Sequence, residues 1–255
     1  MQLGLVTYNL AKDWDLDTLI ANCEETGFAA VELRTTHGHG VEPTLDAAAR
    51  RAVRERFAAS SVTLWGLGTT CEFDSPDASQ LAAQIDEARR FIELAADVGS
   101  AGIKVRPNKL HDGIAPETTC AQIGEALSEV GEAAEQAGVL VYLEVHGRGT
   151  SDPRWIRAIL DACGHPAVGA CWNSNPHAVE VIDGSIKQGF ELLADDLVSC
   201  HINELWRPDY PYRELFARLD EIGYDGYTLA EVPESPEPLR FMRYYRALWE
   251  ALQPS

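Results

Sequence analysis

The stretch VLVYLEVH, residues 139–146, is a short apolar run that ends on a glutamate and a histidine. It directly follows ETTCAQIGEALSEVGEAAEQAG, residues 117–138, in which apolar residues recur three or four positions apart among alanines and glutamates. That spacing predicts an amphipathic helix, and the apolar run after it predicts a buried strand. A helix that leads into a buried strand is the repeating unit of α/β folds.

The same unit recurs along the chain. A glycine commonly separates a helical stretch from the next strand, as Gly99 and Gly138 do, and glycine at this place is typical of a helix end. The expected strands are residues 3–9, 29–34, 62–69, 102–108, 139–146, 168–173, 197–204 and 226–232.

The number of these units decides between two α/β architectures. Eight strand–helix units in 255 residues match the (β/α)8 barrel. The alternative, an open doubly wound sheet, usually has a glycine-rich turn after its first strand, but the turn here reads TYNLAKDWD, residues 7–15. We therefore expect a single (β/α)8 TIM barrel domain over residues 1–255.

The composition excludes several classes of partner. Lys and Arg total 21 against 40 Asp and Glu, so the net charge of −19 disfavours binding to nucleic acid. The N-terminal residues MQLGLVTYNL do not resemble a signal peptide, and no apolar run is long enough to span a membrane. The six cysteines form no C-x-x-C pair, which is typical of buried free thiols in a reducing compartment. We expect a cytoplasmic protein without a membrane or nucleic-acid partner.

Polar side chains gather where the expected strands end, which in (β/α)8 barrels is the place of catalysis. Residues two apart on a strand point the same way, so Glu144 and His146 share a face, and so do Lys104 and Arg106. Carboxylates in a barrel mouth cost several kcal/mol unless each is paired or bound to a metal. Two glutamates, a histidine and an amide from the last four strands suit a divalent ion that accepts oxygen and nitrogen ligands, although salt bridges would explain each residue singly.

Five segments, in this order and spacing, resemble the sugar phosphate isomerase/epimerase superfamily, the xylose isomerase-like TIM barrels. They are GFAAVELR (27–34), VYLEVHG (141–147), VGACWNSN (168–175), VSCHINEL (198–205) and GYDGYTLAEVP (223–233). The superfamily includes ketose 3-epimerases, hydroxypyruvate isomerase, inosose dehydratase and a zinc-dependent apurinic endonuclease branch. The resemblance implies a divalent metal ion (Mn, Mg, Co or Zn) held by Glu144, Asn173, His201 and Glu231.

Asn173 departs from the superfamily pattern, which has aspartate at this place. Its carbonyl oxygen can still ligate a metal but brings no charge, so we expect weaker metal binding. Asn175 or His177, which follow it in the chain, are expected to contact substrate.

The resemblance implies a metal-dependent isomerase or epimerase that acts on a small sugar or polyol-type carbonyl substrate through an enediolate. Glu144 and Glu231 would stand on opposite faces of the substrate, one removing a proton and the other returning one. Two alternatives stay open: a metal-dependent dehydratase or lyase on a similar substrate, and a non-catalytic ligand-binding barrel with a degenerate metal site. An endonuclease is disfavoured by the seven histidines and the acidic charge.

Further substrate contacts are expected from His146, Lys104, Arg106 and Glu32. Lys104 and Arg106 would either bind an anionic substrate group or neutralise Glu32, Glu144 or Glu231, and the sequence does not separate these two roles. The partner is a small sugar-like molecule, and a homo-oligomer is compatible with this sequence.

Overall fold

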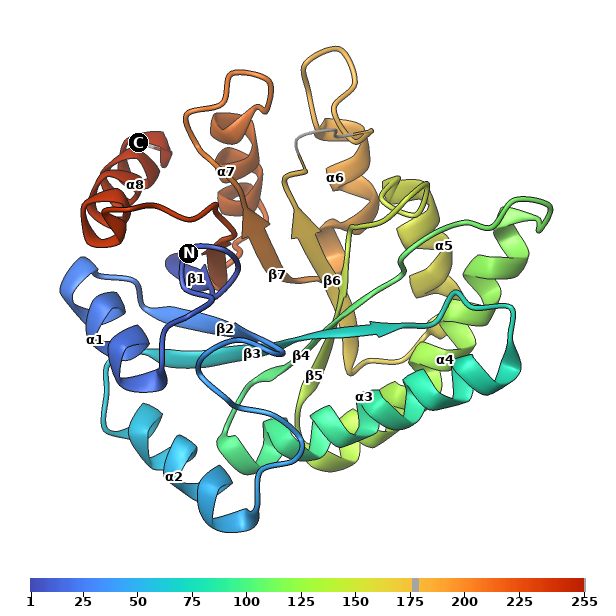
Figure 1. Cartoon of the computed structure of the whole chain (residues 1–255). Helices are drawn as coiled ribbons and strands as arrows, with labels where there is room; N and C mark the ends of the chain where they lie inside the picture. The colour runs from blue at the N-terminus through green and yellow to red at the C-terminus, as the bar shows by residue number, and fades with distance from the viewer. Residues whose placement is uncertain (176–178, 255) are drawn as a thin grey trace.

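Strands and helices alternate from Gln2 to Leu252 in the computed structural model, which describes residues 1–175 and 179–254 (Figure 1). The strands are β1 (Gln2–Val6), β2 (Ala30–Arg34), β3 (Thr63–Glu72), β4 (Gly102–Arg106), β5 (Leu140–Glu144), β6 (Val168–Asn173), β7 (Leu197–Ile202) and β8 (Tyr227–Ala230). The helices are α1 (Leu16–Thr26), α2 (Ala47–Ala58), α3 (Ala78–Val98), α4 (Pro116–Ala137), α5 (Pro153–Cys163), α6 (Lys187–Leu193), η1 (Ala194–Asp196, a 3-10 helix), α7 (Tyr212–Glu221) and α8 (Pro238–Leu252).

The strands close into one parallel barrel. Each strand pairs with the next, and β8 returns to β1 through the partners Leu3↔Thr228 and Gly4↔Leu229. The helices lie outside the strands in Figure 1. The predicted (β/α)8 fold is therefore confirmed.

Local sequence signals account for the helix ends. Asp15 caps the amino end of α1 by accepting from the Thr18 backbone N–H. Gly138 ends α4 with a φ of 70°, a left-handed conformation that glycine adopts without a side-chain clash. These caps define where the two helices begin and end.

Some strand bounds differ from the prediction. Five expected strands run too far. The strands end at Val6, Arg106, Glu144, Ile202 and Ala230, and the polar residues beyond these positions lie in loops. β3 instead continues past the predicted end at Thr69 as far as Glu72, which pairs with Arg106 on β4 after a register shift. This extension places Glu72 at the carboxyl end of the barrel.

The barrel interior is filled by aromatic rings toward the amino ends of the strands. Trp65 stacks on Tyr142 with ring centroids 5.7 Å apart and meets Tyr227 edge-on at 5.0 Å. We call Trp65, Tyr142 and Tyr227 the aromatic floor. On β5 the alternate residues Val141 and Leu143 are fully buried among the apolar residues outside the floor. The floor closes the barrel below the polar residues at the other end.

The cysteines at 23, 71, 120, 163, 171 and 200 are buried and free, as the sequence predicts. Within residues 1–175 and 179–254, none of the helices combines the length and the apolarity that crossing a membrane requires.

Candidate active site

The carboxyl ends of β5, β7 and β8 bring Glu144, His201 and Glu231 together. Each of the three offers one ligand atom, and these atoms lie within 4.8 Å of one another. Glu144 is 2% exposed and His201 is completely buried. Glu231 follows β8 directly, and its backbone N–H donates to the Ile202 carbonyl over 2.9 Å, which fixes it beside β7.

Glu32 on β2 orients the ring of His201. His201 Nε2 lies 3.0 Å from Glu32 Oε2. The other ring nitrogen, Nδ1, lies 3.5 Å from Glu144 Oε1 and 3.9 Å from Glu231 Oε2. Nδ1 has no hydrogen-bond partner among the described residues. A histidine held by a carboxylate at one nitrogen, with the other facing two carboxylates, has the arrangement of a metal ligand.

A glycine on β3 makes room for Glu32. A Cβ atom on Gly68 would lie 2.7 Å from Glu32 Oε1, too close for any side chain without a shift of the carboxylate. The absence of a side chain at position 68 therefore lets Glu32 reach the barrel axis and contact His201.

Lys104 neutralises Glu144. Its Nζ lies 2.8 Å from Glu144 Oε2, and both side chains are almost completely buried. Of the two roles predicted for Lys104, neutralisation is the one for which the structure provides a contact. The contact occupies one oxygen of Glu144 and leaves Oε1 toward His201.

Asn173 lies between the two glutamates. Its Nδ2 donates to Glu144 Oε1 over 2.7 Å and to Glu231 Oε2 over 3.5 Å. Its Oδ1 accepts a hydrogen bond from Asn203 Nδ2 at 3.2 Å. Ligation of a metal through Oδ1 requires this amide to turn over, so the role of Asn173 as a ligand stays a prediction.

The donor set of this cluster fits a divalent metal ion. Two carboxylates and an imidazole nitrogen without a hydrogen-bond partner converge on one point. Such mixed oxygen and nitrogen ligands suit Mn²⁺, Co²⁺ or Zn²⁺, whereas Mg²⁺ favours oxygen ligands. The Lys104 ammonium offsets one of the negative charges that would attract the ion.

The two glutamates have different electrostatic surroundings. Burial alone would raise the pKa of Glu144, but the Lys104 ammonium together with His201 and His146 outweighs it, so that this pKa lies well below its ordinary value. Burial is the main influence on Glu231 and raises its pKa. Burial also opposes the charge on Lys104, yet the carboxylates of Glu144 and Glu32 keep the pKa of Lys104 above its ordinary value.

Arg106 does not join this cluster. Its guanidinium pairs with Glu72, with Nη2 and Oε1 2.5 Å apart. The prediction that Arg106 neutralises Glu32, Glu144 or Glu231 is therefore wrong, because the extended β3 supplies a nearer carboxylate. A role in binding an anionic substrate group stays a prediction.

The other predicted contacts lie close to the mouth. His146 has its Nδ1 buried without a hydrogen-bond partner in the part of the chain that the structure describes, and burial lowers its pKa. Asn175 donates Nδ2 to the Val145 carbonyl over 2.8 Å, which ties the loop after β6 to the loop after β5. His177 lies outside the described residues, so its contact with substrate stays a prediction.

Two residues that were not among the predicted site residues bind residues that were. Asn203, two positions after His201, holds the Asn173 amide. The sequence signal for Asn203 was its place two residues after His201, on the same face of the expected strand 197–204. Glu72 binds Arg106, and no signal pointed to it because the predicted strand ended at Thr69.

The fold and the site can be compared with known proteins. A family model of xylose isomerase-like TIM barrels matches residues 20–247. The chain belongs to this family. No curated protein is significantly similar to it in sequence.

Solved structures of other family barrels superimpose over nearly the whole chain. The 3-keto-D-glucoside 4-epimerase YcjR from E. coli is 17% identical, with a TM-score of 0.79 and coverage of 98% of this chain and 99% of that one. The D-psicose 3-epimerase from Clostridium cellulolyticum H10 is 16% identical, with a TM-score of 0.81 and full coverage of both chains (100% each). IolI with a bound zinc atom is 17% identical, with a TM-score of 0.74 and coverage of 99% of this chain and 96% of that one. At these identities the similarity establishes a shared fold.

Proposed function

We propose that this xylose isomerase-like barrel is a metal-dependent isomerase or epimerase that transfers a proton next to the carbonyl group of a small sugar or polyol-type substrate. The observation that carries the proposal is the convergence of Glu144, His201 and Glu231 within 4.8 Å. Family barrels of the same fold include two sugar epimerases and a zinc-bound protein, which supports this class of chemistry.

Glu144, His201 and Glu231 would hold the ion, with Asn173 as a further candidate ligand. When bound, a divalent ion would polarise a substrate carbonyl and stabilise the negative charge that develops on its oxygen. Glu32 keeps His201 in the orientation that this requires, because it binds the ring nitrogen on the far side.

The two carboxylates are placed for different halves of the proton transfer. The Glu231 side chain is 16% exposed, whereas that of Glu144 is 3% exposed. One of them would remove a proton from the substrate, and the other would return a proton to it. The aromatic floor below them limits access of water from the other end of the barrel.

A second candidate is a non-catalytic barrel that binds a small ligand. The observation that favours it is the occupation of both Glu144 oxygens, one by the Lys104 ammonium and the other by the Asn173 amide. In this state both oxygens of Glu144 have a partner without an ion. A dehydratase would use the same cluster and differs in its product.

The metal content of the protein distinguishes the metal-dependent isomerase or epimerase from the non-catalytic ligand-binding barrel. Elemental mass spectrometry of the wild-type protein, of Glu231→Ala and of Asn173→Asp is compared with the control Glu234→Ala, whose side chain is 73% exposed. We expect about one ion per chain in wild type and in the control, and loss of the ion in Glu231→Ala. Wild type that stays metal-free after reloading, beside Asn173→Asp that takes up metal, would favour the ligand-binding barrel.

Turnover tests the chemistry. With a substrate found by screening ketoses, inososes and keto acids, we expect Glu144→Gln to reduce kcat by about 10²–10⁴-fold, the usual contribution of a general acid or base. Product analysis separates an isomer from a water-loss product. Normal turnover by Glu144→Gln contradicts the two-carboxylate mechanism.

A further inference from the structure

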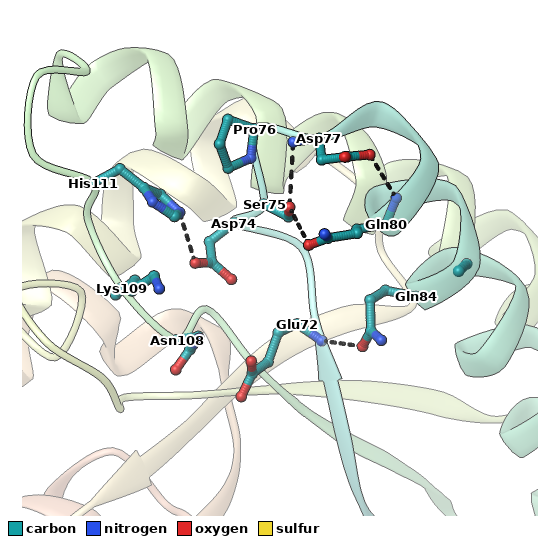
Figure 2. A pocket seen from close by; sticks show the side chains of 11 residues that line it. Glu72, Asp74, Ser75, Pro76, Asp77, Gln80, Gln84, Asn108, Lys109 and His111 are labelled. Carbon is teal, nitrogen blue, oxygen red and sulfur yellow. Dashed lines mark hydrogen bonds and ion pairs between the residues drawn. The ribbon is translucent and has the colours of Figure 1, made fainter.

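A cavity lies at the carboxyl ends of β3 and β4. It has a volume of about 630 Å³. We call it the β3–β4 pocket, and its principal lining residues are Glu72, Asp74, Gln80, Gln84, Lys109 and His111 (Figure 2). This volume lies within the range of small-molecule sites, roughly 300–1,000 Å³.

The loop that forms one wall of this pocket is held in place by hydrogen bonds. Gln122 on α4 donates Nε2 to the carbonyls of Phe73 and Ser75, over 2.8 and 2.9 Å. Ser75 Oγ donates to Gln80 Oε1 over 3.0 Å. The wall is therefore formed before any ligand arrives, which reduces the entropy that binding would cost.

Two amide donors remain free for a ligand. The Oε1 atom of Gln84 accepts from the Glu72 backbone N–H, and that of Gln80 accepts from Ser75. Among the described residues, neither amide nitrogen has a hydrogen-bond partner. Figure 2 shows both side chains at the same cavity.

Acceptors face the same cavity. Asp74 is 5% exposed, and its Oδ2 binds His111 Nε2 at 2.9 Å, so that Oδ1 is left as an acceptor. Together with the two amide nitrogens it forms a mixed set of donors and acceptors. Hydroxyl groups, which both donate and accept, match such a set.

The charge of the pocket disfavours an anionic ligand. Three of its lining residues are carboxylic acids (Glu72, Asp74 and Asp77), whereas Lys109 is the one lysine or arginine among them. Arg106 nearby is already paired with Glu72. A phosphate group would therefore meet net negative charge on a protein whose overall charge is −19.

The pocket and the Glu144 cluster each contain an ion pair formed by a cation of β4. Glu72 lines the pocket and binds Arg106 at the end of β4. Lys104, two residues earlier on the same face of β4, binds Glu144. Two residues along a strand span about 7 Å, so these two ion pairs are anchored close to each other on β4.

We propose that the β3–β4 pocket binds the non-reacting part of the substrate, and that this part is a neutral, hydroxyl-rich group such as a second sugar ring. The substrate is then a glycoside or a sugar of disaccharide size, and it is not a phosphorylated monosaccharide. The identity of the reacting end rests on the proposed function, whereas binding in the pocket does not.

The test measures binding, so that it does not depend on turnover. Sucrose, trehalose, maltose and lactose are titrated into the full-length protein by calorimetry, beside glucose and glucose 6-phosphate. The variants Gln80→Glu and Gln84→Glu keep the Oε1 acceptor that the loop needs and replace the free amide donor by a carboxylate. The control Gln136→Glu makes the same change at an exposed position on α4.

We expect at least one neutral disaccharide to bind more tightly than glucose or glucose 6-phosphate. The double variant Gln80→Glu/Gln84→Glu should weaken it by about 10-fold or more, since two hydrogen bonds of roughly 1 kcal/mol each are lost. Gln136→Glu should leave its Kd unchanged. If one pocket variant does not fold, as judged by circular dichroism, the other single variant carries the test.

Three results overturn the proposal: no binding of any disaccharide, binding that the pocket variants leave unchanged, or tighter binding of glucose 6-phosphate than of the neutral sugars. Failure here together with normal metal content and turnover of a monosaccharide refutes the pocket and leaves the proposed function intact. Disaccharide binding that the variants weaken, in a protein without metal or turnover, supports the pocket and refutes the proposed function.

Discussion

The barrel interior holds two layers that are stabilised in different ways. The aromatic floor buries ring surface and needs few polar partners, whereas the layer above it contains the ionisable side chains of Glu32, Glu144, Lys104 and His201, all at most 3% exposed. Strand β5 supplies a residue to each layer, since Tyr142 and Glu144 are two residues apart on it. Each apolar residue stabilises the barrel through the surface that it buries. A buried charge stabilises it only when its partners of opposite charge are present, so that these residues act as a network.

The largest effect is expected from removing the cation of the charged layer. Lys104→Met leaves Glu144 buried without its ion pair, and we expect the free energy of unfolding to fall by about 3–5 kcal/mol. Urea unfolding in the presence of a chelator measures this. The control is Lys12→Met, whose ion pair with Glu234 is exposed (side chains 43% and 73% accessible), so that its loss should change the stability little. If Lys104→Met and Lys12→Met lose the same free energy of unfolding, the buried charges do not stabilise the barrel as a network.

A change in the floor should affect stability alone. Trp65→Ala removes the ring that contacts Tyr142 and Tyr227, and we expect a loss of about 3 kcal/mol, the lower end for a large aromatic residue because Trp65 is half-buried. Metal content should stay as in wild type. Trp206→Ala, at a side chain 68% exposed, serves as the control for stability. Loss of metal in folded Trp65→Ala would show that the two layers are coupled.

Glu32→Gln tests whether metal binding depends on the carboxylate that orients His201 in the charged layer. It keeps the shape of the side chain that orients His201 but removes its charge, and we expect metal affinity to fall by about 10–100-fold. Competition with a metal-binding dye measures the affinity. Glu72→Gln, which loses an ion pair with Arg106 outside the reach of His201, should leave the affinity unchanged. Similar affinities of wild type and Glu32→Gln would argue against His201 as a ligand.

The smallest effect is expected at a buried carboxylate that has no cation. Glu180 is 1% exposed, neither of its oxygens has a hydrogen-bond partner among the described residues, and burial raises its pKa to about 7. The folded state therefore binds this proton more tightly than the unfolded state. The stability that Glu180 contributes is present below pH 4.5 and is lost as the pH rises through about 7.

Glu180→Gln should remove this pH dependence. We expect the variant to match wild type at about pH 5 and to be more stable by roughly 1–2 kcal/mol at about pH 8. Urea unfolding across this range measures the difference, with the exposed Glu93→Gln on α3 as control. If the free energies of unfolding of Glu180→Gln and wild type differ by the same amount at every pH, Glu180 is not the group whose raised pKa causes the pH dependence.

Much of the site could be predicted from the sequence, because its residues mark the ends of strands. Glu144, His201 and Glu231 each follow an apolar run at the position where a parallel barrel gathers its polar side chains, and the structure brings them together. The side chain of Asn173 lies among them as well. What the sequence did not show was the direction of the Asn173 amide, because that depends on the hydrogen bond from Asn203.

The assignment of cations to carboxylates could not be predicted either. Lys104 and Arg106 look equivalent in the sequence, but Lys104 binds Glu144 and Arg106 binds Glu72. The difference arises from the register shift between β3 and β4, which lies between Gly68 and Glu72. The prediction for β3 ended before this shift and therefore missed both Glu72 and the pocket that it lines.

The sequence by itself determined the order of strands and helices, the closure into a barrel and the residues at its mouth, because hydrophobic periodicity, helix caps and strand ends are local properties of the chain. Only the tertiary structure decided which of those residues meet. Glu32 and His201 are 169 positions apart, and their contact depends on the register of strands on opposite sides of a closed sheet and on the space that Gly68 leaves beside them.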